Sequence, residues 1–267
     1  MPRVPRVANF IWYGDEMPWI RRLSIESFKR LNPGWTVRVL GGKSGWTKKR
    51  RVNESDILRY AHLAEHGGFY FDTDIIFTRP MDAFMERIKG NDTGVCFELS
   101  GPTLVWSLDG RCVETRGIPE WYSIASLFAA PDNAFFRAVH ESSMDDESFK
   151  EQDAQYYGVT AFARMYDTIT DAEEAFPGLS FYNIQRKSFL PVGYKDTRKL
   201  FRNSPMFYGD LMSDEDVFGV HWYGGATTAK IAEEWTHETY WRDSVLGMLV
   251  APCVSESETL LEQHGVG

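Results

Sequence analysis

A hydrophobic stretch from Phe69 to Phe77 carries acidic residues at its centre, in the order Phe-Tyr-Phe-Asp-Thr-Asp-Ile-Ile-Phe. The apolar residues on both sides predict two strand pieces that meet at Asp72-Thr73-Asp74. Because side chains alternate along a strand, Asp72 and Asp74 can project to the same side. Two carboxylates that lose hydration repel each other, so they require a cation or strong hydrogen-bond donors.

A divalent metal ion is the simplest partner for this acidic pair. Carboxylate oxygens are the hard ligands that Mg²⁺ and Mn²⁺ prefer, and such an ion commonly bridges to the phosphates of a substrate. The alternative is structural, since an acidic pair at the end of a strand can also cap a turn. The Asp-x-Asp pattern alone leaves both interpretations open.

The first forty residues predict a strand, a helix and a second strand. Residues 6–12 form the expected first strand, which Gly14 ends. Apolar residues at helical spacing follow Pro18 and stop at Asn32, and residues 35–40 alternate as a strand does. A strand, helix and strand in this order begin the parallel sheet of an α/β protein.

A second helix is expected just before the acidic motif. Asn53 or Ser55 can cap its start, and Gly67 supplies the left-handed residue at its end. Its apolar stripe consists of Ile57, Tyr60, Ala61 and Ala64. Farther along, the sequence predicts a hairpin within residues 103–116, a buried strand at 126–130, a helix at 135–143, and a helical region at 231–250 that carries Trp235, Tyr240 and Trp241.

Composition and charge exclude several classes of protein. The chain of 267 residues has 29 basic and 38 acidic residues, a net charge of −9 that argues against broad polyanion binding. Apolar runs approach neither a membrane span nor a signal peptide. The three cysteines (Cys96, Cys112 and Cys253) are far apart and odd in number, so we expect a reducing, cytoplasmic setting.

The block from Ser55 to Asp74 resembles the signature of glycosyltransferase family 32. The matching residues are Ser55-Asp56-Ile57-Leu58-Arg59 and Gly67-Gly68-Phe69-Tyr70-Phe71-Asp72-Thr73-Asp74. The strong match covers residues 53–80, and the block is also similar to the catalytic domain of the large clostridial glucosylating toxins. Weaker matches are Asn9 to Gly14, which resembles the first strand of the family, and His221-Trp222.

This resemblance implies a fold and an activity. The implied fold is GT-A, an α/β fold with a mixed, mostly parallel sheet flanked by helices and a Rossmann-like nucleotide-binding half. We expect one domain over 1–267, with a donor half at 1–100 and an acceptor half and C-terminal lid at 101–267. The implied reaction moves a sugar from a UDP- or GDP-sugar to a hydroxyl acceptor with retention of anomeric configuration, and it depends on Mn²⁺ or Mg²⁺.

The resemblance also assigns roles to individual residues. The implied catalytic residues are Asp56, Arg59 and Asp72. The implied contacts with the donor are Trp12, Asp56, Arg59, Tyr70, Asp72 and His221, and the implied metal ligands are Asp72, Asp74 and His221. Asp56 and Arg59 are three residues apart, which puts both on one face of the expected helix start, where the helix dipole favours phosphate.

The chain departs from the family pattern in two places. Asn9 stands where the first strand of the family usually has histidine, and the Ser-Trp pair that normally follows the His-Trp segment is replaced by residues 225–228. Contacts between the lid and the diphosphate are therefore expected from Thr227, Thr228 or Lys230, or from backbone amides around the glycines.

A basic segment from Lys43 to Arg51 includes Trp46 among its cationic residues. It is either a solvated loop or a contact for an acceptor or a phosphate, and a nucleic-acid acceptor is one alternative. Two other functions stay open. The chain could bind nucleotide sugars without transferring them. A Mg²⁺-dependent phosphatase of the haloacid-dehalogenase type fits less well, because that family carries its Asp-x-Asp on the first strand.

Overall fold

The computed structural model describes residues 3–42, 45–100, 118–144, 176–226 and 229–263, in two compact units. The first unit comprises Met1–Asp15, Trp35–Asp72 and Glu86–Gln185, and the second comprises Glu16–Gly34, Thr73–Met85 and Arg186–Gly267. The predicted hairpin at 103–116 lies outside the described residues. The division into a donor half and an acceptor half stays a prediction.

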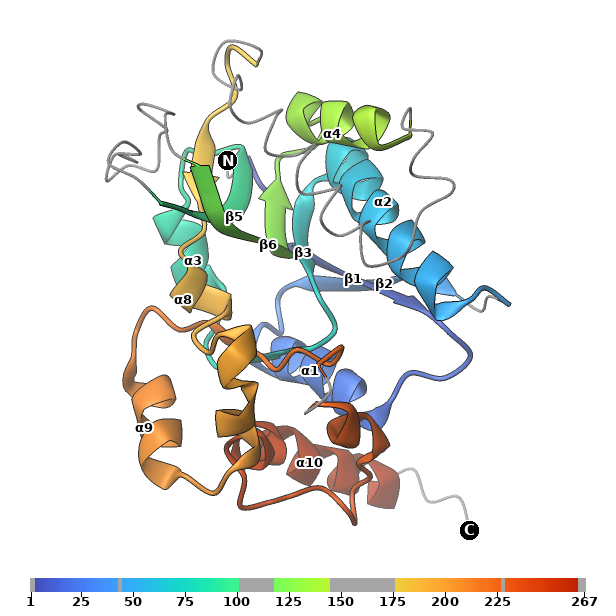
Figure 1. Ribbon diagram of the computed structural model, residues 1–267, viewed down its shortest axis with the longest axis vertical. Coiled ribbons are helices and arrows are strands. Elements are labelled where there is room, and N and C mark those ends of the chain that lie inside the picture. The colour runs from blue at the N-terminus through green and yellow to red at the C-terminus, as the bar shows by residue number, and fades with distance from the viewer. Residues whose placement is uncertain (1–2, 43–44, 101–117, 145–175, 227–228, 264–267) are drawn as a thin grey trace. The chain divides into compact units, whose positions relative to one another are not determined.

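A six-stranded mixed sheet forms the centre of the first unit (Figure 1). Its order is β2 (Thr36–Gly42), β1 (Val7–Tyr13), β3 (Gly68–Phe71), β6 (Ile118–Ala129), β5 (Thr93–Ser100) and β7 (Phe181–Asn183). The pairs β1–β2, β1–β3 and β5–β7 are parallel, while β6 runs antiparallel to both of its neighbours. The predicted α/β class with a mixed, mostly parallel sheet is confirmed.

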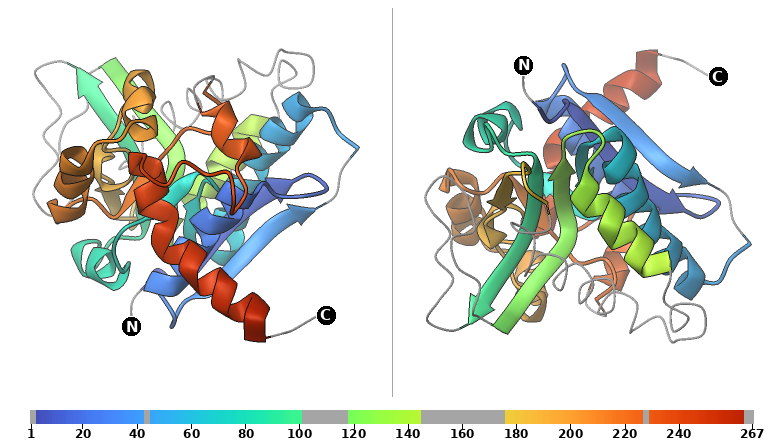
Figure 2. Two further views of the ribbon diagram at one scale, coloured as in Figure 1. Left: turned by 90° about the horizontal axis from the view of Figure 1, so that it is seen from below. Right: turned by 90° about the horizontal axis from the view of Figure 1, so that it is seen from above.

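Two helices of the first unit, α2 (Lys48–His66) and α4 (Ala134–Met144), lie side by side against one face of this sheet (Figures 1 and 2). Their buried residues form one apolar cluster with the sheet, which includes Tyr60, Leu63, Phe135, Phe136, Val139, Ile11, Tyr70 and Leu127. Gly67 ends α2 with φ 64°, as predicted, and a β-carbon there would meet the backbone nitrogen of Pro131 at 2.6 Å.

Helix α2 begins earlier than the sequence predicts. Thr47 caps it, because its Oγ1 accepts the backbone N–H of Arg50 at 3.3 Å. Asn53 and Ser55 therefore lie inside the helix, and Ser55 Oγ donates back to Arg51 O at 2.7 Å. Asp56 consequently lies about two turns inside α2. The prediction that the helix dipole assists this position is wrong, since that effect is confined to the first turn.

Asn9 ties together three elements of the first unit. Its Nδ2 donates to Phe69 O at 3.0 Å, and its Oδ1 lies 3.0 Å from Nε2 of His62 on α2. Asn9 is buried, so these contacts satisfy an amide that is costly to bury alone. The residue that departs from the family pattern thus has a structural role between β1, β3 and α2.

The second unit pairs β4 (Ile75–Phe77) with β8 (Gly219–His221) in an antiparallel ribbon. Helix α1 (Trp19–Leu31) packs on β4 and on α10 (Val245–Gln263). Around them lie α8 (Arg186–Phe189), η1 (Tyr194–Phe201), α9 (Pro205–Ser213) and η2 (Lys230–Glu234), while α3 (Asp82–Arg87) spans the boundary of the units. Trp222, which has no exposed surface, lies in the apolar core of this unit.

The predicted helical region at 231–250 is only partly correct. The 3₁₀ helix η2 ends at Glu234, and α10 begins at Val245, where Ser244 Oγ accepts the backbone N–H of Gly247 at 3.0 Å. Trp235 and Trp241 lie in the segment between these helices, with ring centroids 5.8 Å apart. These two tryptophans were expected on the apolar stripe of a helix, but they pack against each other outside any helix. Among the described residues, no helix is long and apolar enough to cross a membrane.

Candidate active site around the acidic motif

The acidic motif stands where the chain leaves β3 and enters β4. Strand β3 ends at Phe71, and the backbone N–H of Asp72 still donates to Ala125 O on β6 at 2.8 Å. Strand β4 starts at Ile75 and pairs with β8 instead. The prediction of two strand pieces meeting at an acidic centre is confirmed, and the pieces belong to different sheets.

Asp56, Arg59, Tyr70 and Asp72 form one polar cluster in the first unit. The Arg59 guanidinium donates from Nη2 to Asp56 Oδ1 at 2.6 Å and from Nη1 to Asp72 Oδ1 at 3.3 Å. Nη1 also donates to Ile124 O at 2.9 Å, and the guanidinium carbon lies 4.3 Å from the centre of the Tyr70 ring. The Tyr70 hydroxyl donates to Asp72 Oδ1 at 2.6 Å. The structure therefore brings four predicted site residues together.

Exposure differs sharply among the three charged side chains of this cluster. Arg59 and Asp56 are 6% and 4% exposed, whereas the Asp72 side chain is 28% exposed. Burial raises the pKa of Asp56 to about 6, with Asp72 adding to the shift and Arg59 opposing it. Burial alone would lower the pKa of Arg59. The opposing effect of Tyr70, Asp56 and Asp72 is larger, so the pKa of Arg59 is raised. Arg59 stays cationic, and Asp72 is the carboxylate that can reach a ligand.

Asp74 is held by groups of the second unit. Its Oδ1 lies 3.1 Å from Nε2 of His221, and its Oδ2 accepts the backbone N–H of Gly224 at 2.7 Å. The backbone carbonyl of Asp74 accepts the N–H of Trp222 at 2.9 Å, which extends the β4–β8 pairing by one bond. Burial would raise the pKa of Asp74, but His221, Arg21 and the Gly224 N–H outweigh it and lower the pKa. The glycine amide that was expected to meet the diphosphate instead binds the motif.

Arg21 on α1 is a residue of this centre that the sequence analysis missed. Its Nη1 donates to Thr73 Oγ1 at 2.7 Å, and its Nε and Nη2 both donate to Glu233 Oε1, at 2.9 and 2.6 Å. The guanidinium also lies 5.3 Å from the Trp222 ring centre. The sequence shows Arg21 only as a polar residue between Ile20 and Leu23 of the expected helix, which does not indicate a contact with the motif.

Comparisons with known proteins address the family. A family model described as "Glycosyltransferase sugar-binding region containing DXD motif" matches residues 7–92. These residues run from β1 through the Asp72-Thr73-Asp74 motif. Over these residues the chain is similar to that sugar-binding region. The resemblance recognised in the sequence is therefore confirmed over this part of the chain, and a search of curated proteins finds no match.

Solved structures of glycosyltransferases are also similar to this chain. The PaToxG glycosyltransferase has 14% identity, covering 64% of this chain and 72% of its own, with a TM-score of 0.41. A glycosyltransferase involved in the glycosylation of the major capsid of PBCV-1 has 10% identity, covering 86% of this chain and 98% of its own, with a TM-score of 0.46. The galactosyltransferase LgtC, in complex with donor and acceptor sugar analogues, has 12% identity, 85% and 94% coverage, and a TM-score of 0.41.

Trp12 lies at the carboxyl end of β1, within the matched residues 7–92. Strands β1 and β3 are parallel, so Trp12 and Asp72 stand at the same edge of the sheet, where open α/β sheets bind ligands. The indole nitrogen of Trp12 is 3.1 Å from the position that a β-carbon on Gly14 would occupy, so a larger residue there would have to displace the indole slightly. Stacking of Trp12 on a nucleotide base stays a prediction.

The basic segment, which also lies within the matched residues 7–92, leads into α2. The Arg50 guanidinium lies 4.6 Å from the Trp46 ring centre, and the Trp46 ring is 5.3 Å from that of Tyr13. Arg51 donates to Tyr13 O at 3.4 Å. Lys43 lies outside the described residues, as do Thr227 and Thr228 of the expected lid. A nucleic-acid acceptor at this segment stays a prediction.

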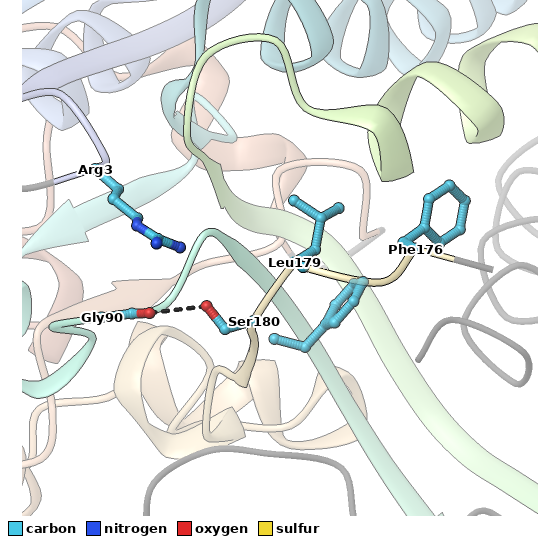
Figure 3. Close-up of a pocket in the computed structure, with 7 residues that line it drawn as sticks. Arg3, Gly90, Phe176, Leu179 and Ser180 are labelled. Atoms are coloured by element: carbon cyan, nitrogen blue, oxygen red, sulfur yellow. Dashed lines mark hydrogen bonds between the residues drawn. The ribbon is translucent and has the colours of Figure 1, made fainter. Parts of the chain in front are cut away.

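A cavity of about 460 Å³ opens elsewhere in the first unit (Figure 3). Its described lining consists of Arg3, Gly90, Phe176, Gly178, Leu179, Ser180 and Phe181, which includes none of the predicted site residues. Arg3 is paired with Asp92 at 2.6 Å, and Ser180 Oγ donates to Gly90 O at 2.8 Å. The side chains of Arg3 and Ser180 thus each make a contact with the protein.

Proposed function

We propose that the chain is a GT-A glycosyltransferase that moves a sugar from a nucleotide sugar to a hydroxyl group of an acceptor, with retention of anomeric configuration. The observation that carries the proposal is the Asp72-Thr73-Asp74 motif at the end of β3. Arg59 and Tyr70 bind Asp72 on the β3 side, and His221 and Gly224 bind Asp74 on the β4 side. Both carboxylates are thus fixed by the protein inside the matched sugar-binding region.

The chemistry of the available ligand atoms fits a divalent cation. Asp74 offers a carboxylate oxygen beside the imidazole nitrogen of His221, and Asp72, two residues earlier, offers a second carboxylate. Mn²⁺ accepts both oxygen and imidazole ligands, and Mg²⁺ accepts the oxygens. We assign Asp72, Asp74 and His221 to this ion. When bound, the metal supplies positive charge that stabilises the departing diphosphate.

The other residues of the site either contact the donor or hold another side chain in position. Asp72 is partly exposed and accepts hydrogen bonds from sugar or ribose hydroxyls in this proposal. Asp56 is buried and acts through Arg59, whose donors also hold Asp72 and the Ile124 carbonyl. Asp56 and Arg59 are therefore positioning residues, and Tyr70 fixes Asp72 through its hydroxyl. Pre-aligned charges of this kind lower the barrier because they need no reorganisation during the reaction.

Retention follows from the face on which the acceptor attacks. As the bond between the sugar and the phosphate breaks, positive character develops on the sugar ring and negative charge on the diphosphate. The acceptor hydroxyl bonds to the anomeric carbon on the face that the diphosphate leaves, and its proton passes to the departing phosphate oxygen. The fixed carboxylate of Asp72 favours the cationic ring in this step.

A binding screen followed by product analysis tests this function. The full chain is heated with UDP- and GDP-sugars, with and without Mn²⁺, and we expect at least one donor to raise the melting temperature only with the metal. That donor is then incubated with water and with hydroxyl acceptors, and proton NMR follows the first anomer formed. Retained configuration supports the proposal, whereas inverted configuration contradicts the mechanism.

Other outcomes distinguish the alternative functions. Metal-dependent binding of a nucleotide sugar with no hydrolysis or transfer indicates a binding protein. Release of phosphate from simple phosphomonoesters, with no response to nucleotide sugars, indicates a phosphatase. Transfer to oligonucleotides that weakens steeply with salt indicates a nucleic-acid acceptor, because contacts with phosphates release counterions.

A further inference from the structure

The last two turns of α2 carry a pair of histidines, His62 and His66, in the first unit. Their ring centroids lie 4.6 Å apart, at an interplanar angle of 60°. Residues four apart on a helix are neighbours on its surface, and helical zinc motifs present two histidine ligands at this spacing. Neither histidine belongs to the polar cluster that holds Asp72 or to the groups that hold Asp74. The proposed transfer reaction therefore gives the pair no catalytic role.

Asn9 determines which nitrogen of the His62 ring carries the proton. The Nδ2 of Asn9 donates to two backbone carbonyls, Phe69 O at 3.0 Å and Gly67 O at 3.4 Å. Its Oδ1 therefore faces His62 and can only accept, so the Nε2 of His62, 3.0 Å away, is the protonated nitrogen. In the neutral ring the lone pair is then on Nδ1. Histidines that bind metals are oriented in the same way, with one ring nitrogen hydrogen-bonded and the other left as the ligand.

The surroundings of His62 keep its ring neutral. Burial lowers the pKa of His62 to about 4, with His66 and Arg38 adding to the shift and Glu65 opposing it. A metal ion binds the neutral form of imidazole. At neutral pH, zinc therefore has no proton to displace from His62.

The charges around the histidine pair bear on a bound cation. The pair is at the carboxyl end of α2, where the helix dipole favours positive charge. Glu65 adds a carboxylate, whose Oε1 lies 3.7 Å from Nε2 of His66. Arg38 on β2 repels a cation, but it is exposed and its charge is screened by solvent. The His66 side chain is 45% exposed, so an ion can reach the pair from solvent.

We propose that His62 and His66 bind Zn²⁺ at a site that shares no residue with the acidic motif. Imidazole suits Zn²⁺, whereas Mg²⁺ and Mn²⁺ suit oxygen ligands. Two imidazole nitrogens about 2.0–2.1 Å from a tetrahedral zinc ion place the ring centres about 5 Å apart, close to the observed 4.6 Å. Because Asn9 connects His62 with β3, the ion should stabilise the junction of α2 with the sheet. The inference is independent of the proposed function.

Zinc titration of the full chain, freed of metal with a chelator, tests the site. Long-range ¹H–¹⁵N NMR of the imidazoles should show His62 protonated on Nε2 before zinc is added. With Zn²⁺ alone, the signals of His62 Nδ1 and of one nitrogen of His66 should shift. By calorimetry, His62→Gln and His66→Gln should each weaken zinc binding at this site at least about tenfold, as loss of even a partner of a metal ligand does. The zinc-dependent rise in melting temperature should shrink in both variants.

Two further variants make the zinc titration decisive. His66 is exposed at the end of α2, so His66→Gln should fold and is sufficient for the test if His62→Gln does not fold. His140→Gln is the matched control, because His140 lies on α4 and has Met144 four residues later. Its zinc binding should equal that of the wild type. Zinc binding and imidazole signals that are the same in the wild type and His66→Gln overturn the inference, as does a His62 ring protonated on Nδ1.

Manganese distinguishes this site from the acidic motif. His66→Gln should keep the wild-type response of the melting temperature to Mn²⁺ and nucleotide sugar, because no oxygen ligand of the acidic motif is changed. Loss of that response in folded His66→Gln would place the histidine pair in the same metal centre as Asp74 and would overturn the inference of a separate site. An unchanged Mn²⁺ response together with weakened zinc binding supports it, whether or not the chain transfers sugar.

Discussion

Arg59 binds Asp72, the first carboxylate of the motif, through Nη1 3.3 Å from Oδ1, while its Nη2 binds Asp56 at 2.6 Å. One buried cation thus holds two acidic side chains that come from α2 and from the end of β3. Because a carboxylate in low dielectric is costly without its partner, this arrangement couples the stability of the first unit to the geometry of its site.

Replacing Arg59 with methionine should destabilise the fold strongly. It leaves Asp56 buried without its cation, so we expect a loss of about 3–5 kcal/mol in the free energy of unfolding, measured with urea. Arg50→Met is the matched control, since Arg50 is on the same helix but pairs with Glu54 near the surface, at 3.5 Å. That change should cost at most about 1 kcal/mol. Equal losses in the two variants would contradict the role assigned to Arg59.

The raised pKa of Asp56 predicts a pH-dependent stability. Its pKa is about 6 in the folded protein and 3.8 in its ordinary state, so between these values the folded form holds a proton that the unfolded chain releases. Stability therefore falls as the pH rises from about 4 to about 6, by about 3 kcal/mol at 1.4 kcal/mol per unit. Asp56→Asn should remove this part of the profile. A difference between wild type and variant that stays constant with pH would contradict the shift.

Arg21 should act on catalysis by positioning Thr73, the central residue of the motif. Arg21→Met removes the hydrogen bond to Thr73 and the pair with Glu233. We expect kcat to fall at least about tenfold, in line with losses from misplaced catalytic groups, with a smaller change in KM. Arg22→Met is the matched control, because Arg22 is the next residue on α1 and is exposed. Arg21→Lys keeps the charge, so its kcat should lie between those of Arg21→Met and the wild type. If Arg21 were purely structural, both variants would have the same kcat after correction for the amount of folded protein.

Local patterns in the sequence predicted the two strands at the motif and the end of helix α2. Apolar residues that flank Asp72 and Asp74 predicted the two strand pieces, and Gly67 predicted the end of α2. The pairing of β4 with β8 could not be predicted this way, because it joins Ile75 to His221 across most of the chain. Hydrogen bonds between distant strands leave no periodicity in either segment.

The part of the site that was predicted came from the resemblance of residues 55–74 to a glycosyltransferase signature. Asp56, Arg59, Tyr70 and Asp72 were expected together and are found together. Arg21 was missed because its role depends on tertiary contacts with Thr73 and Glu233. The start of α2 was placed too late because Thr47 precedes a turn of basic residues, whereas acidic residues usually mark a helix start.

The most direct test of the account compares the wild type with Asp74→Asn in Mn²⁺-dependent turnover of a nucleotide sugar. Asparagine keeps the size of the side chain and an oxygen for the N–H of Gly224, but it removes the charge that lies beside His221 and that would bind the proposed metal. Asp210→Asn, an exposed substitution of the same type, is the control. We expect Asp74→Asn to fold, to lose the Mn²⁺-dependent thermal shift, and to turn over donor at least about a hundredfold more slowly, a loss typical of removing one group that stabilises developing charge. Turnover and metal response equal to those of the wild type would contradict the central claim.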